Sequence, residues 1–152
     1  MTKSQPPNKS QILNPKYIVI DHPSDIGIEA YGKDLKELFE NTALGMMDMM
    51  FELNYLHPEK YILSRKFDVR VSAENLESLL IAWLSELLYI SDSNKVQLSI
   101  FKIIEMTDKT LEAKVLGDKI TQISRFIKAA TYNQLEVKKE NDHWKAKVIF
   151  DV

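Results

Sequence analysis

The spacing of hydrophobic residues changes along this chain, and this change constrains the fold more than any other feature. Two segments, residues 35–50 and 76–90, carry apolar side chains at the 3.6-residue spacing of a helix that buries one face. From residue 96 onward, apolar and polar residues mostly alternate, and shorter alternating runs precede each helical segment. We therefore predict an α+β fold, with two helices packed on one face of a mostly antiparallel sheet of about six or more strands.

Local signals indicate where these elements begin and end. Asp34 and Asn75 precede the two helical segments and are expected to cap them, and Glu37 completes a capping-box pattern with Asp34. In the strand-rich half we predict a bulge near Phe101, a break at Gly117–Asp118, an extended run over Phe126–Tyr132 and a hairpin turn at Asn141–Asp142.

Composition narrows the classes of protein. Residues 1–16 are polar and carry three lysines and no acid, so we predict a disordered tail there and a single domain over 17–152. That domain holds 17 basic against 22 acidic residues, a net charge of -5, which argues against direct nucleic-acid binding. The absence of cysteine excludes disulfides and thiolate metal sites. No apolar run is long enough to cross a membrane and no secretory signal is visible, so we expect a cytoplasmic protein.

Two acidic segments far apart in the sequence are the best candidates for chemistry. Asp25 follows a Pro-Ser turn and begins an apolar run, whereas Asp151 and Val152 end the last strand-like run. Taken alone, Asp25 is an ordinary turn residue. Together, two aspartates and the α-carboxylate of Val152 offer three hard oxygen donors for a divalent cation. Calcium is favoured over Mg2+ or another divalent ion because calcium tolerates irregular geometry.

Other candidates carry a weaker signal. His22 is more typical of an ordinary turn histidine than of a metal ligand or proton carrier, because no histidine spacing for zinc is present. Lys128 interrupts an apolar extended run and is able to pair with a carboxylate, a phosphate or an acidic partner. The methionines at 46–50 are either an adaptable binding surface or, more simply for Met46 and Met50, part of the core.

The ordered motifs of this chain resemble those of the archease family. The residues that carry the resemblance are Asp21-His22-Pro23-Ser24-Asp25-Ile26-Gly27-Ile28, Glu40-Asn41-Thr42-Ala43-Leu44-Gly45-Met46, Trp83-Leu84-Ser85-Glu86-Leu87-Leu88-Tyr89, Lys128-Ala129-Ala130-Thr131-Tyr132 and Val148-Ile149-Phe150-Asp151-Val152. The chain departs from the family pattern by having Pro23 and Ser24 for Thr-Ala, Asn133 for His and Val152 for Ile. Pro23 alters the turn that aims Asp25.

The resemblance implies a role in RNA processing. Archeases activate the GTP-dependent RNA ligase of the RtcB type in tRNA splicing and RNA repair, by promoting guanylylation of the ligase histidine and multiple turnover. By match to the family, Asp25, Asp151 and Val152 bind the metal, usually calcium, and Lys128 is needed for function. The protein would then be a cofactor protein rather than an enzyme. Two alternatives remain open: a metal-dependent hydrolase that uses the same carboxylates, and a chaperone-like binding module that uses the methionine-rich helix.

Overall fold

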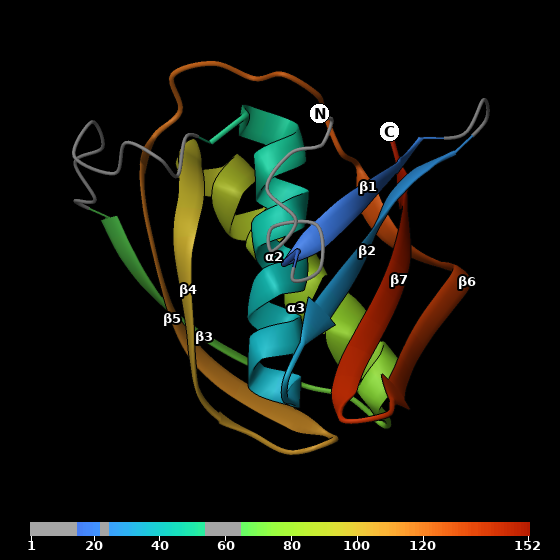
Figure 1. Ribbon diagram of the computed structural model, residues 1–152. Coiled ribbons are helices and arrows are strands. Elements are labelled where there is room, and N and C mark those ends of the chain that lie inside the picture. The colour runs from blue at the N-terminus through green and yellow to red at the C-terminus, as the bar shows by residue number, and fades with distance from the viewer. Residues whose placement is uncertain (1–14, 22–24, 54–64) are drawn as a thin grey trace, which may run out of the picture.

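The computed structural model describes residues 15–21, 25–53 and 65–152, and within them it contains two helices and seven strands (Figure 1). In chain order these are β1 (Tyr17–Asp21), β2 (Ile26–Gly32), α2 (Leu35–Phe51), β3 (Arg65–Ser72), α3 (Leu76–Asn94), β4 (Val96–Met106), β5 (Thr110–Lys119), β6 (Ala129–Glu140) and β7 (His143–Asp151). The predicted α+β class and the antiparallel pairing are confirmed. The predicted tail lies outside the described residues, apart from its last two.

The strands form two separate antiparallel sheets, in the orders β1-β2-β7-β6 and β3-β5-β4. In the four-stranded sheet, β2 pairs with β7 although almost the whole chain separates them, and this pairing brings the two ends of the fold together. Helix α2 packs against β2 and β4, and helix α3 packs against β6 and β3. Because each helix contacts both sheets, the helices join the two sheets through one core (Figure 1).

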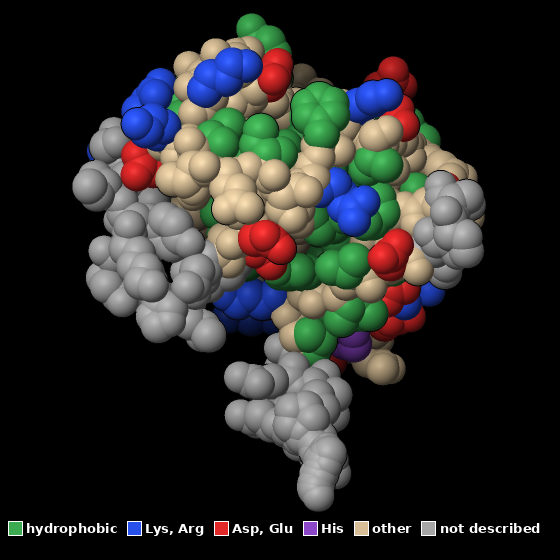
Figure 2. All heavy atoms as spheres, turned by 90° about the horizontal axis from the view of Figure 1, so that it is seen from above, with side chains coloured by type: hydrophobic (Ala, Val, Ile, Leu, Met, Phe, Trp, Pro, Cys, Tyr) green, Lys and Arg blue, Asp and Glu red, His purple; other side chains and the backbone are tan. Residues whose placement is uncertain are grey.

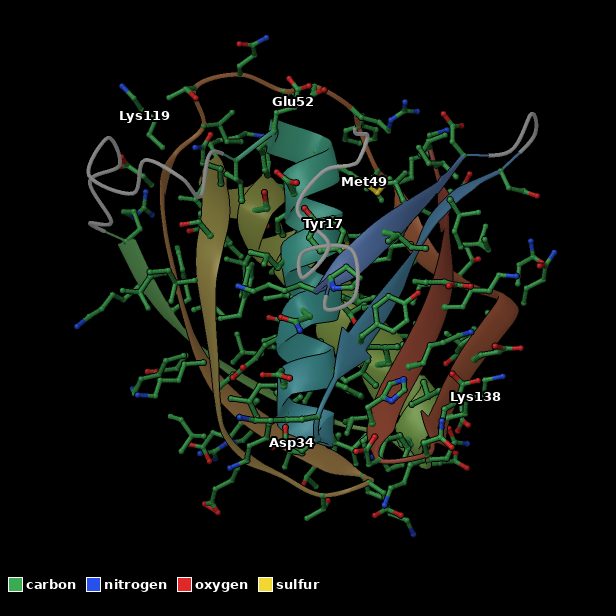
Figure 3. All side chains as sticks on the ribbon, viewed as in Figure 1. Tyr17, Asp34, Met49, Glu52, Lys119 and Lys138 are labelled. Atoms are coloured by element: carbon green, nitrogen blue, oxygen red, sulfur yellow. The ribbon has the colours of Figure 1, made fainter. Side chains whose placement is uncertain are left out.

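The helices begin where the sequence predicts. Asp34 accepts a hydrogen bond from the Glu37 amide at 2.9 Å, and the Glu37 carboxylate accepts one from the Lys33 amide at 2.8 Å. Asn75 caps α3 in the same way, at 2.8 Å from the Ser78 amide. At the C-terminal end of α2, Glu52 adopts a left-handed conformation with φ of 51°. Figure 3 labels Asp34 and Glu52 at opposite ends of this helix.

The core contains most of the methionine cluster. Met46 and Met47 are fully buried and Met50 nearly so, which confirms core filling for Met46 and Met50. These three side chains are therefore not available as an exposed binding surface. The fully buried Trp83 donates a hydrogen bond from its indole nitrogen to the Phe39 carbonyl at 2.9 Å and so links α3 to α2.

One local prediction is wrong, one is confirmed in part and two are confirmed. Strand β5 runs through the predicted break to Lys119, and Gly117 is needed there because a Cβ atom would lie 2.3 Å from the Gln97 carbonyl oxygen of β4. The run predicted as extended from Phe126 becomes a strand only at Ala129. The predicted bulge near Phe101 and the hairpin turn at Asn141–Asp142 are both present.

Candidate metal and partner site

The strand register brings the predicted site residues to one end of the four-stranded sheet. The last pair between β2 and β7 is Ile26 with Phe150, so the next residues along these strands, Asp25 and Asp151, lie beside each other. On the other side of β7, the Lys128 amide donates a hydrogen bond to the Asp151 carbonyl at 2.7 Å. Three segments that are distant in sequence therefore meet at Asp151, and Val152 follows directly.

The same register sets the direction of the two carboxylates. Ile26 and Phe150 are buried and face the core, so Asp25 and Asp151 project toward the opposite face of the sheet. Side chains of directly opposed residues share a face, and neighbouring strands lie about 4.8 Å apart. Calcium binds oxygen at about 2.3–2.6 Å, so two such carboxylates are able to share one ion.

Among the described residues, side chains alone do not complete a metal site at this end of the sheet. Across 15–21, 25–53 and 65–152, no group of three or more His, Cys, Asp or Glu side chains is placed to hold a metal ion. Asp25 and Asp151 supply two donors, so a cation site at this end needs further oxygen ligands in addition to this pair. The oxygen donors favour a hard cation such as calcium or magnesium over zinc.

Lys128 provides a cation next to these carboxylates. Its side chain is exposed, and none of the Asp or Glu side chains that the structure describes lies within 4 Å of its ammonium group. The ammonium group is therefore available for a negatively charged group of another molecule. Lys128 also lines a pocket of about 340 Å³ that the sequence does not predict.

The remaining candidates fall elsewhere. His22, Pro23 and Ser24 lie outside the described residues, and with them the effect of Pro23 on the turn. Asn133, the departure from the family pattern, is exposed on β6. In the described part of the chain, no helix is long and apolar enough to cross a membrane.

A polar contact that the sequence does not reveal fixes β1 to α2. The Tyr17 hydroxyl donates a hydrogen bond to the Asp48 carboxylate, and Tyr17 points toward α2 in Figure 3. Burial raises the pKa of both groups above their usual values, and the neighbouring carboxylate raises that of Tyr17 further. Both residues lie away from the paired ends of β2 and β7, so we assign this contact to the fold rather than to the site.

Comparison with known proteins identifies the family. Residues 17–152 match the archease protein family, and the chain belongs to it. The archease of Methanosarcina acetivorans is 36% identical over 145 residues, which cover 90% of this chain and 96% of that protein. The archease of Methanosarcina barkeri is 34% identical over 145 residues, which also cover 90% of this chain and 96% of that protein.

Two solved structures share the fold. The solution structure of Methanobacterium thermoautotrophicum protein 1598 has a TM-score of 0.71 and 31% identity, and it covers 90% of this chain and 99% of that one. The crystal structure of a Thermotoga maritima archease, described as a possible chaperone, has a TM-score of 0.60 and 23% identity and covers 88% of this chain and 94% of that one. The second likeness supports the fold alone.

Proposed function

We propose that this protein is a metal-binding cofactor protein that activates a GTP-dependent RNA ligase of the RtcB type in tRNA splicing or RNA repair. The observation that carries the proposal is the meeting of Asp25, Asp151 and Lys128 at one end of the sheet, in a member of the archease family. In this role the protein promotes guanylylation of the ligase histidine and multiple turnover, and it does not itself cut or join RNA.

The proposed roles follow from the chemistry of the residues. Asp25, Asp151 and the Val152 α-carboxylate hold one divalent ion, and waters complete its shell. Calcium is favoured because it tolerates irregular geometry and takes about 6–8 oxygen ligands. A bound divalent ion offsets negative charge on phosphate groups. Lys128 contacts the partner or orients the neighbouring acidic group. The net acidic body of the domain suits a basic, phosphate-binding surface on the ligase.

The test is single-turnover formation of the ligase–GMP adduct and multiple-turnover RNA joining, each with and without this protein, over a range of calcium and magnesium concentrations. We expect wild type to accelerate both steps. Asp25→Asn and Asp151→Asn should lower calcium affinity and activation at least about tenfold, since loss of even an indirect metal contact has effects of that size. Lys128→Ala should impair activation while leaving calcium affinity nearly unchanged.

Matched variants control for loss of surface charge. Asp108→Asn in the β4–β5 turn and Lys102→Ala on β4 change exposed residues away from the site and should behave as wild type. Equal rates with and without wild-type protein, at every metal concentration, would reject the cofactor role. Hydrolysis of generic phosphoesters by the protein alone would instead favour the metal-dependent hydrolase.

A further inference from the structure

A pocket of about 340 Å³ opens beside the candidate site, at the end of the molecule viewed in Figure 2. Its walls come from the C-terminal end of α2, the exposed face of α3 and the segment 120–128. Lys128 belongs both to the pocket wall and to the backbone contact with Asp151, so the pocket and the acidic strand ends are continuous.

Large hydrophobic side chains are exposed around this pocket. Tyr89, Ile123 and Phe126 are 67%, 55% and 56% exposed, and they are three of the nine large hydrophobic residues exposed in the described part of the chain. Single exposed hydrophobic residues are common on protein surfaces, but a group that surrounds a cavity is typical of an interaction site. Exposed tyrosine and phenylalanine are also enriched in protein–protein interfaces.

The pocket wall is held in place although the segment 120–128 forms no helix or strand. The Ile120 amide donates to the Lys95 carbonyl at 3.2 Å, the Ser124 amide to the Met50 carbonyl at 2.7 Å, and the Lys128 amide to the Asp151 carbonyl at 2.7 Å. Between these anchors the Ile127 side chain is buried in the core. A wall that is already ordered loses little conformational entropy when a partner binds.

The charges on the pocket rim favour a particular kind of ligand. Asp92 and Lys95 lie 3.7 Å apart and offset each other, whereas Lys128 has no acidic partner among the described residues. Among the described residues, the rim therefore carries one lysine without an ion-pair partner next to an apolar cavity. A complementary partner presents a large apolar side chain with a carboxylate beside it.

We infer that this pocket receives a large apolar side chain from a segment of the ligase, and that an acidic residue of the same segment pairs with Lys128. The inference rests on the proposed function, because it takes the ligase as the partner. It assigns docking to the pocket and leaves metal binding to Asp25 and Asp151. Docking here would hold the acidic strand ends against the ligase, since Lys128 connects the two regions.

The test measures direct binding of wild-type protein to the ligase and, separately, the concentration of this protein that gives half-maximal guanylylation. Tyr89→Ser and Ile123→Ser remove two exposed pocket side chains. Two controls replace exposed side chains that do not line this pocket. Tyr132→Ser, at 61% exposure, matches Tyr89→Ser, and Val19→Ser, at 51% exposure, replaces a β-branched side chain as Ile123→Ser does. We expect roughly tenfold weaker binding for the two pocket variants and less than about twofold change for the controls.

Further readouts separate docking from other effects. At saturating concentration, the pocket variants should reach the wild-type maximal guanylylation rate, because the metal-binding residues are intact. Their urea unfolding should match wild type, since the replaced side chains are exposed. Lys128→Glu should weaken binding more than Lys128→Ala, because it reverses the charge that faces the acidic residue.

Each alternative outcome is distinguishable. Pocket variants that bind and activate as wild type would overturn the inference while the proposed function stands. If the pocket variants bind the ligase more weakly but wild type does not activate it, the pocket is a ligase-docking site and the proposed function is rejected. A wild-type dimer that Tyr89→Ser dissociates, or tighter ligase binding after deletion of residues 1–14, would identify a different occupant and overturn the inference.

Discussion

Gly27→Ala tests whether the close contact between β2 and β7 sets the geometry of the candidate site. A Cβ atom at Gly27 would lie 2.3 Å from the Val148 carbonyl oxygen and 2.9 Å from Cδ1 of Ile149. The first distance is about 1 Å shorter than an ordinary van der Waals contact, and the obstructing atom belongs to the backbone and cannot rotate away. The two strands must therefore separate.

The expected cost follows from two opposing effects. Overpacking a tight interior contact lowers the free energy of unfolding by about 1–3 kcal/mol. Replacing glycine by alanine in a strand raises it by about 0.5–1 kcal/mol, because the unfolded chain has less conformational entropy to lose. Because backbone must move, we expect the free energy of unfolding to fall by about 2 kcal/mol. Asp25 and Asp151 each lie two residues from this contact, so separation of the strands should also lower calcium affinity.

The assay combines urea unfolding with calorimetric calcium titration at a temperature where the variant is fully folded. Trp83→Phe serves as a control, because it destabilises the core by removing the hydrogen bond between α3 and α2 and leaves the sequences of β2 and β7 unchanged. A Gly27→Ala protein with unfolding free energy within about 0.5 kcal/mol of wild type would refute the steric reasoning. An equal loss of calcium affinity in Trp83→Phe would show that general destabilisation, rather than strand separation, affects the site.

Two further predictions concern the fold. Trp83→Phe removes the hydrogen bond to the Phe39 carbonyl and leaves a small cavity, so urea unfolding should show a loss of about 2 kcal/mol, and an unchanged midpoint would contradict this. Burial raises the pKa of Glu40, although the Ile103 amide opposes this shift by donating to its carboxylate at 2.9 Å. A raised folded-state pKa gives stability that is fully present below the unfolded pKa and is lost as pH rises through the folded value. The unfolding free energy of wild type minus that of Glu40→Gln should therefore fall as pH rises above about 4, near the pKa of an unfolded glutamate. A rise of this difference over the same pH range would contradict the direction of the shift.

The elements with a strong local signal are the ones that sequence predicts. Asp34 and Asn75 cap their helices because a short polar side chain satisfies a free amide in the first turn, which is a local interaction. The turn at Asn141–Asp142 is local in the same sense, and Asn141 adopts the left-handed conformation, with φ of 56°. None of these predictions requires knowledge of which strands pair.

The division into two sheets depends on pairing that local patterns do not encode. Alternation identifies β2 and β7 as strands but does not indicate that they are neighbours. Likewise, the sequence predicts that a strand ends at Gly117. The close contact with β4 that requires glycine at this position is not visible in the sequence. The run predicted as extended over Phe126–Tyr132 forms a strand only from Ala129, because amide hydrogen bonds to the Met50 and Lys95 carbonyls hold the chain just before it in an irregular path. The pocket was missed for this reason.

The strand order separates the proposed calcium-binding residues, Asp25 and Asp151, from the proposed docking residue, Lys128. Asp25 and Lys128 lie on opposite sides of β7, with Asp151 between them, so the strand spacing places their backbones about 10 Å apart. At that separation a single ion held by Asp25 and Asp151 would lie on the side of Asp151 that faces β2, while Lys128 lies on the side that faces the pocket. Lys128 variants should therefore weaken docking with little effect on calcium affinity, and Asp25 variants should do the reverse. Asp151, which adjoins both, is the position where one substitution should affect both properties.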